Sequence, residues 1–76
     1  MSLRNSKVFA VEFNSRLDKL EMPSDFRIRI SLVSKLLHIS PEKVRFWLYG
    51  HQLPNKDEMN LLISEFGFDA NFLNEF

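Results

Sequence analysis

The residues that could recognise another molecule gather in the segment 40–50. Arginine pairs with guanine or with a phosphate, glutamate accepts a hydrogen bond from cytosine N4, and phenylalanine packs against the methyl group of thymine. At about 100° per residue of a helix, Val44, Trp47 and Leu48 define a buried side of this segment. The residues that face away from that side or flank it, with Ser40 at the helix start, are the candidate base contacts: Ser40, Glu42, Arg45, Phe46 and Tyr49.

Basic and polar residues around this segment are of the types that contact nucleic-acid phosphates. The candidate phosphate contacts are Arg27, Arg29, Ser31, Lys35, Lys43, His51, Asn55 and Lys56. Simpler interpretations stay open for several candidates. Arg27 and Arg29 can form a solvated face instead. Glu42 can favour the helix dipole at a helix start, and an exposed Phe46 can be a protein contact.

No arrangement in the sequence favours catalysis or a metal site. The two histidines, His38 and His51, are thirteen residues apart and have no acidic or thiol companions. The chain has no cysteine, which excludes disulfides and thiolate metal ligands. No Ser/His/Asp spacing or paired carboxylates suggest an active site, and a domain this small has little core to hold a cleft. We therefore expect neither an enzyme nor a bound cofactor or metal.

The composition is that of one folded domain, residues 1–76, with 45% hydrophobic and 26% charged residues. The net charge is zero, which by itself argues against nucleic acid. The charge is uneven, however, because residues 1–50 carry +4 and residues 51–76 carry −4, and such asymmetry can point a basic face at an anionic partner. No apolar run exceeds four residues, so we expect a cytoplasmic protein without membrane association.

Five helices and no sheet are predicted to position these residues. Apolar residues recur at helical spacing within pieces that the prolines and glycines separate. The predicted faces are Phe9, Phe13, Leu17 and Leu20; Ile30, Val33 and Leu37; Val44, Trp47 and Leu48; and Met59, Leu62, Ile63 and Phe66, followed by a short helix from Asp69. The predicted caps are Ser24 or Asp25, Ser40 with Pro41, Gly50, Asn55 with Glu58 as a capping box, and Gly67.

The turn between the second and third helices carries the most specific signal. Residues 34–50 resemble the helix-turn-helix of the lambda-repressor-like (Cro/repressor type) family. That family has a small residue within the second helix, a turn of the Gly-Val-Ser type, a third helix ending in Trp-Leu-x-Gly, and a Leu-Pro soon after. Here these positions hold Ser34, His38-Ile39-Ser40, Trp47-Leu48-Tyr49-Gly50 and Leu53-Pro54. The resemblance extends from about Phe13 to Leu73.

The resemblance implies an all-α, five-helix lambda-repressor-like domain with its helix-turn-helix at about residues 25–50. It also implies sequence-specific binding of double-stranded DNA by a small transcriptional regulator of the repressor type. The candidate base contacts match the positions that face bases in that family. Two residues depart from the pattern. His38 replaces the usual turn glycine, and Ile30 stands where a phosphate-binding Gln or Ser is usual, with Ser31 adjacent.

Two phenylalanines at the chain end predict a homodimer. Phe72 and Phe76 have no obvious place in so small a core, and exposed aromatic side chains favour a two-fold contact. A dimer would also let the domain span two DNA half-sites. The alternative is that Phe72 folds back on Phe9 or Phe13.

Two other functions stay open. One is a protein-interaction module that keeps the fold without DNA binding. The other is an antitoxin-type regulator that binds both DNA and a partner protein.

Overall fold

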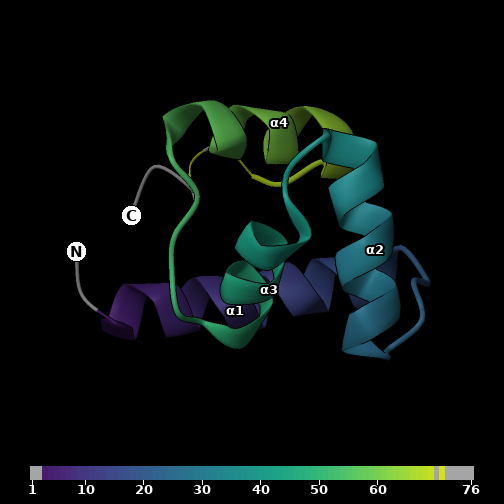
Figure 1. Cartoon of the computed structure of the whole chain (residues 1–76). Coiled ribbons are helices and arrows are strands. Elements are labelled where there is room, and N and C mark those ends of the chain that lie inside the picture. Colours follow the sequence, from purple (N-terminus) through teal and green to yellow (C-terminus); the bar gives the residue numbers. More distant parts are fainter. Residues whose placement is uncertain (1–2, 70, 72–76) are drawn as a thin grey trace.

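The computed structural model describes residues 3–69 and residue 71, and within them it contains four α-helices and no strand (Figure 1). The helices are α1 (Leu3–Lys19), α2 (Phe26–Leu37), α3 (Pro41–Tyr49) and α4 (Lys56–Phe66). The all-α prediction is confirmed, and four of the five predicted helices are present. Most of the predicted fifth helix lies outside the described residues, and so do the predicted dimer contacts Phe72 and Phe76.

The helix starts follow the predicted capping residues. Asp25 caps α2, because its carboxylate accepts a hydrogen bond from the Arg27 backbone N–H over 2.8 Å. The Ser40 hydroxyl accepts from the third residue of α3 over 3.3 Å. Asn55 and Glu58 form the complete capping box at the start of α4, with hydrogen bonds of 2.7 and 2.8 Å. Each cap satisfies backbone N–H groups that the helix itself leaves without an acceptor.

The helix ends depend on left-handed residues. Gly50 and Gly67 close α3 and α4 with φ of 77° and 71°, a conformation that glycine adopts without steric cost. α1 ends at Lys19, and Glu21 then takes φ of 61° before the Met22–Pro23 step. The chain therefore leaves the helix before Leu20. That residue is 47% exposed and does not continue the buried face of α1 as predicted.

α1 and α4 run along opposite sides of the molecule in Figure 1, α2 stands beside them, and α3 lies between. α3 packs against both α1 and α2. The centre of the core is the Phe13 ring, which lies 5.5–6.4 Å from the neighbouring aromatic rings of Phe9, Trp47, Phe66 and Phe68. Burying these large rings supplies the apolar area that a chain of 76 residues needs.

Within the described residues, no helix is both long and apolar enough to cross a membrane.

Candidate nucleic-acid interface

A turn of three residues, His38, Ile39 and Ser40, joins α2 to α3. His38 adopts the left-handed conformation, with φ of 55° and ψ of 43°, at the position where the resembled family has glycine. The backbone N–H groups of His38 and Ile39 both donate to the Ser34 carbonyl, and the Ser34 hydroxyl donates to the Ile39 carbonyl over 2.6 Å. Ser34 thus closes the turn with both its backbone and its side chain.

The buried side predicted for α3 is confirmed, because Val44, Trp47 and Leu48 are all buried. On the outer side, Glu42 and Arg45 are exposed and lie one helical turn apart. Neither side chain forms an ion pair among the described residues.

Phe46 is half-buried rather than fully outward. The chain turns back after Gly50, where the His51 N–H donates to the Phe46 carbonyl over 2.9 Å. The His51 ring then lies edge-on to the Phe46 ring at 6.2 Å, and the Arg45 guanidinium lies 5.3 Å from the same ring. A cation over an aromatic face is held by the ring quadrupole, so Phe46 restrains Arg45 as well as offering apolar surface.

A hollow of about 190 Å³ lies on this side of α3. Its lining is Ser40, Glu42, Lys43, Phe46 and Gln52. The first four are predicted contacts, which the structure brings together. Gln52 was not predicted, because it stands in the loop after α3, where no helical period applies. Its carboxamide is of the type that pairs with adenine. The residue type alone could therefore have indicated Gln52 as a candidate contact.

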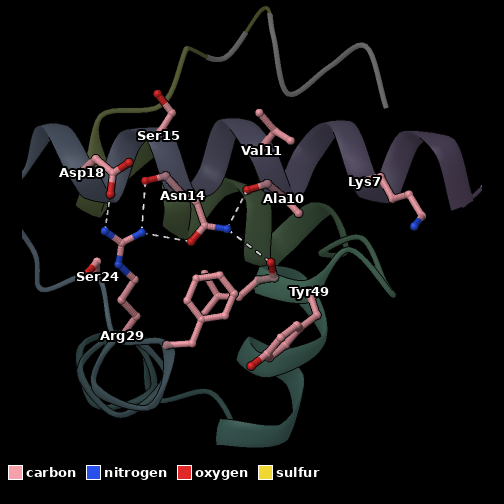
Figure 2. Close-up of a pocket in the computed structure, with 11 residues that line it drawn as sticks. Lys7, Ala10, Val11, Asn14, Ser15, Asp18, Ser24, Arg29 and Tyr49 are labelled. Atoms are coloured by element: carbon pink, nitrogen blue, oxygen red, sulfur yellow. Dashed lines mark hydrogen bonds and ion pairs between the residues drawn. The ribbon is translucent and has the colours of Figure 1, made fainter.

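Tyr49 is exposed but directed away from this hollow. Its ring packs edge-on against the Phe26 ring at 5.0 Å and lies nearly parallel to the His51 ring at 6.4 Å. Tyr49 also lines a separate groove beside α1 (Figure 2). It therefore lies at the border of the α3 face rather than in its centre.

The predicted phosphate contacts fall into three groups: five exposed residues, two residues whose side chains already have close polar partners, and the buried Arg29. Those on the surface are Arg27, Ser31, Lys35, His51 and Lys56. Two others have partners already. Lys43 Nζ lies 2.6 Å from the Glu58 carboxylate, and Asn55 uses its side-chain oxygen in the α4 cap.

Arg27 is almost fully exposed, and its guanidinium lies 3.6 Å from the Asp25 carboxylate. The hydrogen bond from the Arg27 backbone N–H is the main reason that the pKa of Asp25 is held below its ordinary value of 3.8. The positive charge of Arg27 acts in the same direction.

One predicted phosphate contact is wrong. Arg29 is only 2% exposed, and each of its five side-chain N–H groups has an acceptor; Figure 2 shows the contacts with Asn14 and Asp18. Nε donates to the Pro23 carbonyl, Nη1 to the backbone and side-chain oxygens of Asn14, and Nη2 to the Met22 carbonyl and the Asp18 carboxylate. No N–H remains for a phosphate.

Arg29 is buried because it lies one helical turn before Val33, on the side of α2 that packs inward. The charge is tolerated there because carbonyls and a carboxylate surround it. Asn14 extends the network, since its Nδ2 donates to the Leu48 carbonyl over 3.2 Å and to the Ala10 carbonyl over 3.0 Å. The network therefore fixes the end of α3 relative to α1 and α2.

Within the described residues, no group of three or more His, Cys, Asp or Glu side chains could hold a metal ion. Comparison with known proteins finds no matching protein-family model, no matching curated protein and no matching solved structure. The resemblance to lambda-repressor-like domains therefore stays a prediction from the residues quoted in the sequence analysis.

Proposed function

We propose that this chain is a small, sequence-specific DNA-binding regulator of the lambda-repressor-like type, and that α3 enters the major groove of the duplex. The main support is the unit of α2, a three-residue turn and α3. In a helix-turn-helix the second helix of the motif, here α3, contacts the base edges, while the first, here α2, crosses the DNA backbone. An α-helix with its side chains is about 10–12 Å across, so α3 can enter a major groove that is about 12 Å wide.

Base recognition falls mainly to Glu42 and Arg45. Arginine donates two hydrogen bonds to guanine O6 and N7, and a carboxylate accepts one from cytosine N4. Both side chains are exposed on one side of α3. Ser40 and Gln52, at the edge of the same face, add groups that can both donate and accept. The expected operator therefore contains G·C pairs opposite the first two turns of α3.

Backbone contacts fall to the lysine and arginine residues among the predicted phosphate contacts that are exposed, which are Arg27, Lys35 and Lys56. Each neutralised phosphate steepens the dependence of log K on log salt by about 0.9. Three such contacts predict a slope of about −3. This shallow dependence agrees with a chain of zero net charge.

The test is selection of duplexes from a random pool at about 50 mM salt, with the wild type, Arg45→Ala and Lys19→Ala. Lys19 is an exposed cation of α1 outside the candidate interface, so its variant controls for lost charge. We expect one enriched motif for the wild type and for Lys19→Ala, and relaxed preference at one position for Arg45→Ala. If the wild type retains no duplex, the proposal is wrong.

A protein-interaction module is the second candidate, and one observation favours it. Ile28, Leu32 and Leu36 follow each other at one-turn spacing on α2 and are 39–55% exposed. Such an apolar row is typical of a contact with another protein. A chain that binds no duplex in the selection would fit this candidate instead.

A further inference from the structure

A groove of about 670 Å³ lies beside α1. One wall is the side of α1 that runs from Lys7 through Val11 to Asp18, and Tyr49 lies across from it (Figure 2). Phe26 also lines the groove, and its ring packs against the Tyr49 ring. None of the exposed residues at the centre of the α3 face, Glu42 and Arg45 among them, lines it. The groove and the centre of the candidate DNA interface are therefore different surfaces, which meet at Tyr49.

Two polar side chains that line this groove, Arg29 and Asn14, have no free N–H group for a ligand to use. All five N–H groups of Arg29 have acceptors, as described above. Both N–H groups of the Asn14 carboxamide donate to carbonyls, and its oxygen accepts from Arg29. Between the charged residues Lys7 and Asp18, the groove offers an occupant apolar wall from Ala10, Val11 and the two aromatic rings.

Apolar surface also continues outside the groove. Val11 is 67% exposed, the highest value among the large hydrophobic side chains that the structure describes, and Val8 on the same helix is 43% exposed. Tyr49 on the opposite wall is 53% exposed. A groove with an exposed apolar rim is typical of a protein–protein contact.

The ends of the groove carry opposite charges. Lys7 lies at one end of the α1 wall and Asp18 at the other, eleven residues or about 16 Å apart. Asp18 binds Arg29 but keeps 65% of its side chain exposed, so the carboxylate can accept a second cation. The wall is therefore complementary to an antiparallel copy of itself, since reversal sets a positive end against a negative end.

We propose that a second copy of this chain occupies the groove, with the two α1 helices packed antiparallel about a two-fold axis. The axis passes between residues 12 and 13, so that Lys7 pairs with the partner's Asp18 and Asp18 with the partner's Lys7. Val11 then lies opposite the partner's Asn14 and enters the partner's groove. Ala10 and Ser15 are small residues that allow the helices to approach closely.

A second copy is favoured over another partner because this surface is complementary to itself. In a two-fold interface one patch serves both subunits, so it must be complementary to itself. This wall meets that condition in charge and in shape, because it supplies both a protruding Val11 and a groove to receive it. Parallel packing would set Lys7 against the partner's Lys7 and Asp18 against the partner's Asp18, and like-charge repulsion disfavours it.

The first test is sedimentation of the wild type at about 100 μM without DNA. We expect a dimer for the wild type, a dissociation constant at least about tenfold weaker for Val11→Asp, and a dimer for Leu20→Asp. Leu20 is an exposed leucine that does not line the groove, so its variant controls for the added charge. A monomeric wild type overturns the proposal, and so does a dimer that Val11→Asp leaves unchanged.

The absence of native cysteine allows a second test that does not weaken the apolar contact. Lys7→Cys and Asp18→Cys chains, each first checked for a native melting transition, are oxidised separately and as a mixture. We expect a disulfide-linked heterodimer in the mixture and far less cross-linking in either variant alone, because only the antiparallel arrangement joins positions 7 and 18. The proposal is overturned if Lys7→Cys alone cross-links as much as the mixture does. Neither test contains DNA, so failure here leaves the proposed function standing.

Discussion

The Arg29 guanidinium donates to the Asn14 side-chain oxygen over 3.0 Å, and Asn14 in turn donates to the Leu48 carbonyl over 3.2 Å near the end of α3. Two side chains thus connect α2 to α1 and α1 to α3. The helix that carries the candidate base contacts is held in this way by polar contacts as well as by the apolar core. Because Arg29 is buried, we expect its replacement to lower the stability of the fold and not to remove a direct contact with a ligand.

Arg29→Met should lower the free energy of unfolding by about 2–4 kcal/mol, because several hydrogen bonds to a charged group are lost and their acceptors stay partly buried. Arg27→Met is the matched control two residues away, where the side chain is 93% exposed, and its effect should be below about 0.5 kcal/mol. Urea denaturation of the three proteins measures both values. Equal midpoints for the two variants would contradict the buried position of Arg29.

Trp47→Ala should cost about 3–5 kcal/mol, the usual range for a buried aromatic residue. Trp47 is fully buried and its ring meets the Phe13 ring edge-on at 6.2 Å. A domain of this size has about 5 kcal/mol of stability in total, so the variant should be largely unfolded. Thermal melting followed by circular dichroism is the measurement. A cooperative transition within a few degrees of wild type would show that Trp47 is not in the core.

His38→Gly should stabilise the domain by about 0.5–1 kcal/mol, because a left-handed backbone strains any residue with a Cβ atom. The melting temperature of so small a domain should rise by several degrees. His51→Gly is the control, since His51 does not have a positive φ and gains only unfolded-state freedom from the change. An unchanged or lowered melting temperature for His38→Gly would show that contacts of the imidazole stabilise the fold by at least as much as the backbone strain destabilises it.

The cap at Asp25 should make stability depend on pH. Its folded-state pKa lies below the ordinary 3.8, chiefly because of the hydrogen bond from the Arg27 N–H. The stabilisation is therefore complete above the unfolded-state pKa and is lost as the pH falls through the folded-state pKa. Asp25→Asn keeps a capping oxygen but cannot titrate. The stability advantage of wild type over this variant should shrink on acidification below 3.8, whereas a constant difference would contradict the assignment.

The sequence predicted the elements that depend on local chemistry. The caps at Ser40 and Asn55, the left-handed ends at Gly50 and Gly67, and the buried side of α3 follow from residue types and helical period alone, and all are present. These features could be predicted because each is decided by neighbours within one or two helical turns.

The sequence could not predict contacts between distant segments. Arg29 looks like a surface cation until the α1–α2 loop and Asn14 supply its acceptors. Phe46 becomes half-buried only because the loop after α3 brings His51 against it. Both cases depend on tertiary packing. The position of a residue around its own helix does not show which other segments will contact it.

Binding of a duplex by the exposed face of α3 is tested most directly by NMR. A ¹⁵N-labelled sample is titrated with a duplex of about 20 base pairs at about 50 mM salt, where even non-specific complexes form. The backbone amide signals of Ser40, Glu42 and Arg45 should shift, and those of Val8 and Lys19 on α1 should not. A spectrum that stays unchanged at saturating duplex, or shifts confined to α1, would contradict DNA binding through α3.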